Sequence, residues 1–546
     1  AETVSAAREA ASVLEIDVTD GVVSPAPVDV PSFSIGDVPS DSAHRVCVTV
    51  RAASVDAAPL EPLAAVAVPV TPESLIVYSG SQDPFAERRR LEGYLGCAVQ
   101  VESLPTGGSF GARGASIVSG LAALMAYTLE RPAKLTLTHE DSERLLPAQP
   151  AMTATVTLSA DADGQLSGVE ADLQTDLGAY CDQGPTLLAR ALRLAAGPYA
   201  APAVHATATA TLTHRPPTGP GRGLWMAPLA FALEQAMDRL AETIAVDPMT
   251  LRRQNLDRPT VDGPVLDALR ETYDEARASG QAVGLACARQ VLGLGGAEQA
   301  TVAFALRPGG EVRIHTGFAE SGQGFRALAI DRAASITGAP RSVFTLQTDT
   351  ALDVDSGPTI AGRDVWLGLA AIEDAARKMK TAPTLWVGDV LMGQATSDTE
   401  AVVFGFCAQL ARLDADGTLQ EVVVAVDVGD DVDAVITRGQ IEGAVHMGMG
   451  IAVSEQKSTS DAGVPETQYR KLGPLKAKFS PSISSIAIGS SGVRPIGDVA
   501  VLATAPAIAS ALRLAGETPE DTLPMQRNPV ARAMGVKPPR KRNRRR

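Results

Sequence analysis

Glycine-flanked polar residues are the groups in this chain whose types and spacing could do chemistry. Gln82 lies in SGSQDP, and a second cluster follows in PTGGSFGARG with Gly107, Gly108, Phe110 and Gly111. Glycines let backbone N–H groups approach a ligand closely, and the helix expected after the loop adds partial positive charge at its N-terminus. Such a loop suits a phosphate or a metal-oxo group, although a glycine cluster alone is also typical of an ordinary turn.

Two charged residues could take part directly in a reaction. Arg222 lies in RPPTGPGRGLWMAP, where prolines and glycines could hold its guanidinium toward a carbonyl or carboxylate. The alternative for this segment is a surface turn with a solvated arginine. Asp498 lies in a Gly-Asp step before an apolar helical segment, so it could act as a base or only cap the helix.

Two further clusters carry polar groups between glycines. Gln323 lies between glycines in HTGFAESGQGF, and its amide offers a donor and an acceptor to a polar heterocycle. The segment GPTIAGRD follows at Gly357–Asp364.

The elements that must position these loops are hairpins and helices. Period-two apolar alternation around a tight acidic or glycine turn predicts three hairpins, with turns at Asp161–Gly164, Pro308–Gly310 and Asp414–Gly417. Helical periodicity covers Gly114–Leu129, Leu229–Ile244 and Gly368–Met379, and a glycine turn opens another helix after Gln323. Hairpins alternating with helices predict an α+β fold whose helices cover one sheet face.

Composition narrows the classes of function. The net charge of −15 argues against nucleic acid as the main partner, because a phosphate-binding surface needs a basic field. The exception is the KPPRKRNRRR run at Lys537–Arg546, which we interpret as a solvated tail rather than a binding element. The five cysteines form no CxxC pair, which predicts neither a zinc site nor an iron–sulfur cluster and indicates a reducing compartment.

Membrane and export signals are weak. The best apolar run, Ala64–Val70, is far too short to span a membrane. The first residues read as a helix running into a strand, without the basic start and long apolar stretch of an export signal. We therefore expect a cytoplasmic protein with no membrane contact.

The order of the clusters along the chain resembles the molybdopterin-binding subunit of the xanthine dehydrogenase and aldehyde oxidase family, from about residue 60 to 515. DPMTLRRQNL at Asp247–Leu256 is similar to the end of that family's first molybdenum domain, and KLGPLKAKFSPSISSIAI more faintly resembles its selenium-dependent branch. The ordered motifs are Gln82, GGSFG, GAY at Gly178–Tyr180, GPY at Gly197–Tyr199, the Arg222 loop, GQG, Asp349-Thr350, GQIEGAVHMGMG at Gly439–Gly450 and Gly497-Asp498.

The resemblance implies an α+β fold with two successive molybdenum-cofactor-binding domains of mixed sheets and helices, preceded by a partial hammerhead-like domain. A polar connection over residues 255–285, expected to carry one helix, separates the two halves. The implied division is residues 1–60 for the C-terminal part of the hammerhead-like domain, 61–270 and 271–516 for the two cofactor-binding domains, and 517–546 for a C-terminal extension with a basic tail.

The resemblance also implies roles for individual residues. Arg222 would orient the substrate and stabilise negative charge that develops on it, and Asp498, at the place of the family's glutamate, would be the general base. No side chain would ligate the metal, which the pterin dithiolene holds. The cofactor contacts would be Gln82 at the apical oxo group, the loop of Gly107, Gly108, Phe110 and Gly111, Gln323 and Gly324 at the pterin, and Ile360, Ala361 and Gly362 close to the metal.

The implied reaction is hydroxylation of a purine, N-heterocycle or aldehyde with water as the oxygen source. The cofactor would be the molybdopterin molybdenum cofactor, for which a cytosine dinucleotide form is one alternative. Electrons would leave to iron–sulfur and FAD centres on partner subunits, and we expect a dimer of heterotrimers.

Some residues depart from the family pattern. Asp498 is one methylene shorter than the family's glutamate, a misplacement of roughly an ångström that can cost about a hundredfold in rate. Gly114 stands where purine-acting members carry a second acidic residue, Arg113 replaces the loop's usual lysine, and Trp225 follows the arginine loop. These departures, and a hammerhead-like part limited to residues 1 to about 55, keep a second hypothesis open: a cofactor-binding or structural homologue that has lost hydroxylase activity.

Overall fold

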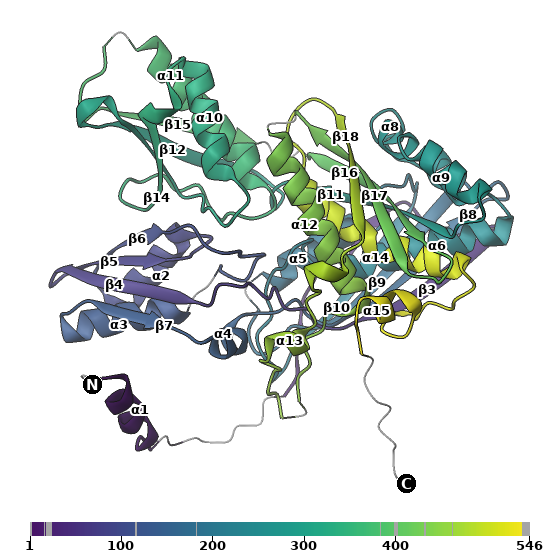
Figure 1. Ribbon diagram of the computed structural model, residues 1–546, viewed down its shortest axis with the longest axis horizontal. Helices are drawn as coiled ribbons and strands as arrows, with labels where there is room; N and C mark the ends of the chain where they lie inside the picture. The colour runs from purple at the N-terminus through teal and green to yellow at the C-terminus, as the bar shows by residue number, and fades with distance from the viewer. Residues whose placement is uncertain are drawn as a thin grey trace.

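The computed structural model describes residues 3–15, 17, 24–114, 117–181, 183–382, 384–397, 402–430, 433–460 and 462–537. In this part of the chain the strands form four β-sheets, each with helices packed on it, which confirms the α+β prediction (Figure 1). Residues 538–546, which make up most of the basic run, lie outside the described residues.

The largest sheet has seven strands in the order β1-β10-β9-β8-β3-β19, with β2 also paired to β10. A boundary at residue 60 or 516 would therefore cut through one sheet, because β3 pairs with both β8 and β19. The division of the chain at residues 60, 270 and 516 stays a prediction, and strand pairing over such separations leaves no local pattern in the sequence. The strands are β1 (Ala26–Val28), β2 (Phe33–Ile35), β3 (His44–Ala52), β8 (Met152–Ala160), β9 (Leu166–Asp176), β10 (Val204–Leu212) and β19 (Thr522–Leu523).

A smaller sheet in the order β6-β5-β4-β7 carries the first glycine loop. It packs its buried face, with Leu75 and Val77, against Val118 and Ala122 of α3. The loop leaves β6 and runs into α3, so this sheet fixes its direction. The elements are β4 (Ala64–Thr71), β5 (Ser74–Ser79), α2 (Pro84–Leu95), β6 (Ala98–Ser103), α3 (Ile117–Leu129) and β7 (Ala133–Thr136).

Two four-stranded sheets make up the second half. The order β11-β16-β17-β18 packs on α14 (Ile496–Leu514), which also contacts α6 (Ala227–Ile244) and α12 (Ala434–Val453), while α6 packs on the seven-stranded sheet. The order β14-β13-β12-β15 is covered by α10 (Phe325–Thr337) and α11 (Leu369–Thr381). The strands are β11 (Val283–Val291), β12 (Glu298–Leu306), β13 (Val312–Thr316), β14 (Phe344–Thr348), β15 (Val390–Ser397), β16 (Phe404–Leu413), β17 (Leu419–Gly429) and β18 (Ser482–Gly489).

All three predicted hairpins are confirmed, as β8–β9, β12–β13 and β16–β17. The four predicted helices are also confirmed, as α3, α6, α10 and α11. The connection over 255–285 carries two short helices, α8 and α9, rather than one. The remaining α-helices are α1 (Val4–Ser12), α4 (His139–Leu145), α5 (Gly184–Arg193), α6 (Ala227–Ile244), α7 (Pro248–Gln254), α8 (Asp262–Asp267), α9 (Arg270–Ala278), α10 (Phe325–Thr337), α11 (Leu369–Thr381), α12 (Ala434–Val453), α13 (Tyr469–Leu472), α14 (Ile496–Leu514) and α15 (Pro529–Ala533).

The prediction that no apolar run reaches the length of a membrane span was wrong for α14 (Ile496–Leu514). By length and composition α14 would be long enough, but 78% of its apolar window is buried inside the protein. It lies between a sheet and two other helices, so its hydrophobicity serves the core. The sequence predicted a strand directly after α1, but residues 13–15 and 17 form no strand.

Candidate functional site

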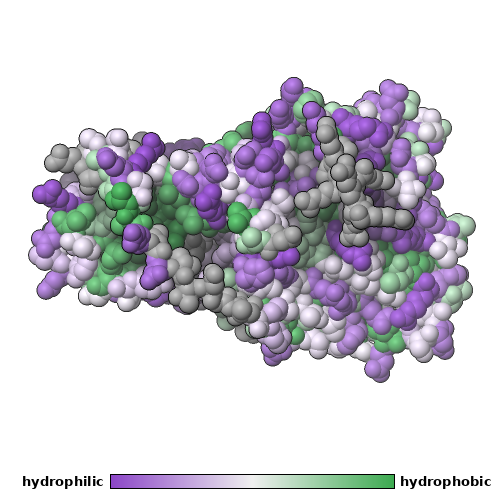
Figure 2. All heavy atoms as spheres, turned by 90° about the horizontal axis from the view of Figure 1, so that it is seen from below, coloured by the Kyte–Doolittle hydropathy of each residue, from purple (hydrophilic) through white to green (hydrophobic). Residues whose placement is uncertain are grey.

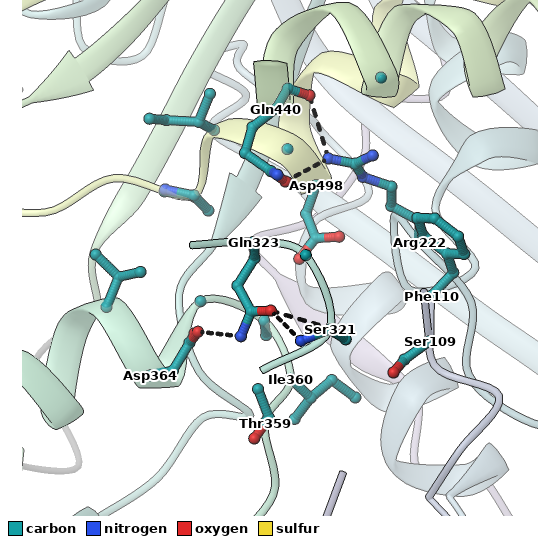
Figure 3. A pocket seen from close by; sticks show the side chains of 18 of the residues that line it. Ser109, Phe110, Arg222, Ser321, Gln323, Thr359, Ile360, Asp364, Gln440 and Asp498 are labelled. Atoms are coloured by element: carbon teal, nitrogen blue, oxygen red, sulfur yellow. Dashed lines mark hydrogen bonds between the residues drawn. The ribbon is translucent and has the colours of Figure 1, made fainter. Parts of the chain in front are cut away.

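Loops from both halves of the chain meet around one cavity of about 410 Å³ (Figure 3). It brings together most of the residues that the sequence singled out. Gly107, Gly108 and Gly324 belong to the same loops but do not line the cavity. The predicted residues in its wall are Gln82, Phe110, Gly111, Arg222, Gln323, Ile360, Ala361, Gly362 and Asp498.

The first glycine loop reaches the cavity by positive-φ backbone. Phe110 has φ 51° and Gly111 has φ 96°. A Cβ on Gly111 would lie 2.7 Å from the carbonyl oxygen of Pro220, so glycine is what lets this loop touch the Arg222 loop. Arg113 holds the loop from behind, because its Nε donates to Gly108 O at 2.9 Å and its Nη2 to Glu61 O at 2.7 Å. Arg113 thus stabilises the loop through hydrogen bonds and does not line the cavity.

Gln82 links the two halves at the cavity wall. Its Nε2 donates to Thr359 O at 2.9 Å, and its Oε1 accepts from Arg113 N at 3.1 Å. The backbone repeats the link, since Thr359 N donates to Gln82 O at 2.8 Å. Among the described residues the second Nε2 hydrogen has no acceptor, so it is available to a ligand in the cavity.

Ser109 places an unpaired hydroxyl group in the cavity wall. Its side chain lines the cavity and is buried, and its Oγ has no hydrogen-bond partner among the described residues. An unpaired buried hydroxyl costs about 1–3 kcal/mol. A polar ligand in the cavity would remove that cost.

Arg222 points into the cavity and contacts α12 and the start of α14. Its Nη2 donates to Gln440 Oε1 at 3.0 Å and to Gln440 O at 3.2 Å (Figure 3). A Cβ on Gly497 would lie 2.3 Å from Nη2, so the guanidinium lies directly on that backbone. Burial lowers the pKa of Arg222, and the negative charge of Asp498 partly offsets this. No carboxylate forms an ion pair with Arg222 in the described part of the chain, so its charge can serve a ligand.

Asp498 lies in the first turn of α14 but does not cap it. The N-cap position is Pro495, and Asp498 Oδ1 instead accepts from Gly223 N at 3.1 Å. The capping alternative is therefore wrong, and the carboxyl group ties α14 to the Arg222 loop. Asp498 lines the cavity, and no described residue donates a hydrogen bond to its second oxygen, Oδ2.

Gln323 is engaged within its own loop. Its Nε2 donates to Ala319 O at 2.7 Å and to Asp364 Oδ2 at 2.9 Å, while its Oε1 accepts from Ser321 N at 2.7 Å. Burial is the main cause that raises the pKa of Asp364. A side-chain contact from Gln323 to a pterin would have to replace one of these bonds.

Comparison with known proteins assigns the chain to a family. Two models, each described as a molybdopterin cofactor-binding domain, match residues 24–256 and residues 263–391 with 386–470. The chain belongs to the molybdopterin cofactor-binding family. The matches cover the loops that line the cavity up to α12. The likeness to a selenium-dependent branch stays a prediction.

Relatives and solved structures agree with this assignment. The chain is 26% identical to a probable xanthine dehydrogenase subunit of Bacillus subtilis, covering 86% of this chain and 74% of that protein. It is 30% identical over 227 residues to the nicotinate dehydrogenase large molybdopterin subunit of Eubacterium barkeri, covering 40% of this chain and 53% of that protein. The aldehyde oxidoreductase of Desulfovibrio gigas shares the fold, with a TM-score of 0.83 at 21% identity, over 94% of this chain and 64% of that one.

Several cavity residues of this family member were missed by sequence reasoning. Gln440 lies in a motif used for the family resemblance, and the glycines at 439 and 443, one helical turn apart, could have drawn attention to it. Ser109 lies inside the quoted glycine loop. Nothing local marks Arg494, which lines the cavity while its Nε donates to Asp427 Oδ2 at 2.8 Å.

Arg190 of α5 supports the site from behind. It donates to the carbonyl oxygens of Gly293 and Val291 and, at 3.1 Å, to Gln290 Oε1. Burial lowers the pKa of Arg190 to about 10, against the opposing effect of Asp498. Gln290 Nε2 in turn donates to Gly223 O at 3.2 Å, so this arginine braces the backbone that holds Asp498.

Trp225 does not narrow the cavity. It is buried beneath the arginine loop, where its Nε1 donates to Gly219 O at 2.9 Å, and Leu224 lines the cavity instead. The difference from the family pattern at Trp225 therefore affects how the Arg222 loop is held and not the shape of the cavity. Gly114 also lies outside the lining, and a Cβ there would meet nothing within 4 Å.

Proposed function

We propose that this chain is the catalytic, molybdenum-cofactor-binding subunit of a hydroxylase that oxidises a purine, N-heterocycle or aldehyde. The observation that carries this is a single cavity in which Arg222 and Asp498 lie on the wall beside the unpaired hydroxyl of Ser109. The overall reaction converts RH and water to ROH, two protons and two electrons. The substrate class within these three remains part of the proposal.

The residues present fit the cofactor. Ser109 Oγ and the unused Nε2 hydrogen of Gln82 can bond polar atoms of the group, and the backbone of residues 109–111 and 360–362 can approach it closely. When bound, the molybdenum cofactor supplies two-electron oxidation chemistry. The Gln323 loop would lie against the pterin part. The molybdopterin could carry a cytosine nucleotide, which is a prediction of the family resemblance.

The chain's own side chains have separate tasks. Asp498 accepts the proton at Oδ2 while Gly223 N holds Oδ1 in place, which is the arrangement a positioned general base needs. Arg222, held by Gln440, faces the developing negative charge of a heterocycle or carbonyl and stabilises it. A preorganised cation of this kind acts most strongly where water is excluded.

We further propose that electrons leave to iron–sulfur and FAD subunits and that the assembly is a cytoplasmic dimer of heterotrimers. The names of relatives as subunits support separate partner chains. The division at about residue 270 between two cofactor-binding domains is likewise proposed; the two matched segments, 24–256 and 263–470, support it.

A second candidate is a cofactor-binding subunit without hydroxylase activity. The observation that favours it is the short reach of Asp498, whose carboxyl group is already committed at Oδ1 to Gly223 N. In that case the carboxylate would only fix the Arg222 loop.

The test is molybdenum and pterin content together with a substrate screen. The chain is produced in a host known to make the cofactor, and molybdenum per chain is measured by elemental analysis. Dye reduction is then followed over purines, N-heterocycles and aldehydes. About one molybdenum per chain with turnover supports the hydroxylase; one molybdenum without turnover supports the second candidate. Far less than one molybdenum per chain contradicts both.

A further inference from the structure

One face of α3 is apolar and uncovered. Ile117, Leu121, Leu124 and Met125 are 54%, 44%, 50% and 37% exposed. Their spacing of four, three and one residues puts them on a single stripe of the helix. Figure 2, which views the protein from below, shows hydrophobic side chains on the end of the molecule where Figure 1 has both α1 and α3.

The opposite face of α3 already serves the core. Val118, Ala122, Ala123 and Ala126 are buried against the β4–β5–β7 side of the sheet. The sequence of the helix, IVSGLAALMAYTL, contains no charged residue. A surface helix of a monomer normally carries polar residues on its outer face, so this composition indicates that a protein surface covers it.

The stripe is too small to hold two copies of the chain together by itself. A helix of 13 residues is about 20 Å long at about 1.5 Å per residue. A stripe about 10 Å wide would then bury roughly 400 Å² in a symmetric pair, against about 1,000 Å² for a specific interface. The stripe suits the apolar centre of a larger interface, with Arg90 and Glu130 in a polar rim at its ends.

Its position connects it to the cofactor cavity. Residues 109–111 line the cavity, and the same chain segment leads within a few residues into α3. Arg90 of α2 joins the two parts, because its Nη2 donates to Gly114 O at 3.1 Å. A protein docked on α3 therefore lies beside the loop that would contact the cofactor.

The electrons of the proposed reaction indicate which kind of partner covers this face. The proposed reaction releases two electrons, and the sequence offers no cysteine spacing for a cluster to receive them. We propose that the apolar face of α3 docks the iron–sulfur subunit that takes up these electrons, an inference that rests on the proposed function.

The test compares the natural complex, purified through a tag on this chain, with the chain alone. Hydrogen–deuterium exchange is measured over residues 117–129 in both. We expect slower exchange of α3 in a complex whose iron content and mass spectrum identify a stoichiometric iron–sulfur subunit. Unchanged exchange of α3 in that complex overturns the proposal, whatever the variants show.

A double variant, Leu121→Glu with Leu124→Glu, tests the same face by binding. Glutamate forms helices well, and both side chains are about half exposed, so the fold should be kept. Burying two carboxylates in the interface should cut the iron–sulfur subunit recovered with the chain by about tenfold or more. The matched control is Leu514→Glu, at the far end of α14, where the side chain is 45% exposed; it should keep the subunit.

The outcomes separate this inference from the proposed function. Dye reduction by the double variant should equal that of the wild type, because the cavity is untouched. Retention of the iron–sulfur subunit by the double variant overturns the docking proposal. A wild-type dimer of this chain alone that dissociates in the double variant assigns the face to a second copy and also overturns it. Docking through α3 in a complex without molybdenum leaves the inference standing and refutes the proposed function instead.

Discussion

Asp498→Asn separates the chemical role of this carboxyl group from its structural one. In the wild type Oδ1 accepts from Gly223 N at 3.1 Å, and the amide oxygen of asparagine can accept the same bond. Asparagine cannot take up a proton at neutral pH, so a general base is lost while the loop stays in place. We expect turnover to fall by about 100-fold to 10,000-fold, the usual contribution of general base catalysis.

The structural contribution is measured by Asp498→Ala. This variant removes the acceptor of Gly223 N, and a hydrogen bond to a charged group contributes about 1.5–3 kcal/mol. The free energy of unfolding should therefore fall by about that amount in the alanine variant and by much less in the asparagine variant. Chemical denaturation of the two variants gives the difference directly.

Asp498→Glu tests whether the short side chain limits the rate. The extra methylene moves the carboxyl group farther toward the cavity, and a convincing gain would be about tenfold in kcat, which corresponds to about 1.4 kcal/mol. All rates are compared by dye reduction at equal molybdenum content. An asparagine variant as active as the wild type refutes the assignment of the base. Equal inactivity of wild type and variants across the substrate screen leaves only the cofactor-binding function.

Three further predictions concern other parts of the molecule. Gly497→Ala should lower kcat/KM by about tenfold or more at unchanged molybdenum content, because the new Cβ would displace Arg222 Nη2, whereas Gly93→Ala, which meets nothing within 4 Å, should not. Burial, with Asp56 adding to it, raises the pKa of Glu143 from 4.5 to about 8. Between these two pKa values the folded chain keeps a proton on Glu143 that the unfolded chain releases. The free energy of unfolding should therefore fall by up to about 1.4 kcal/mol per pH unit as the pH rises from 4.5 to about 8. Glu143→Gln should flatten that slope in denaturation series. Finally, the pure chain should show no iron–sulfur or flavin absorbance, and stoichiometric iron or flavin in it would contradict the reliance on partner subunits.

The parts of the fold that sequence predicted are those encoded over a few residues. Alternation about a tight turn needs only neighbouring positions, so the three hairpins were found with their turns in place. The same holds for helices with a clear apolar period. By contrast, β3 pairs with β8 across 100 residues or more and with β19 across more than 400, and no local pattern records such pairing. The pairing of β3 with β8 and β19 could therefore not be predicted from the sequence.

The candidate site shows the same limit at the level of single residues. The order of glycine motifs along the chain predicted which loops meet, but not which side chain each loop presents. Gln440 holds Arg222 across 218 positions, and Arg190 reaches Gln290 across 100. Arg190 lies in an ordinary amphipathic helix, where an arginine is expected to be solvated. Its buried acceptors come from the end of β11 and the residues just after it, namely Val291 O, the side-chain Oε1 of Gln290 and Gly293 O.

The glycines made the loops recognisable in the sequence, but they did not reveal which parts of the chain the loops contact. Gly111 is required by the carbonyl of Pro220, and Gly497 by the guanidinium of Arg222. In each case the sequence records the removal of a side chain, because only its absence lets another part of the chain approach. A missing side chain marks a close contact but carries no information about the partner. The order of several such motifs along the chain indicated which loops meet, because that order resembles the order in a known family.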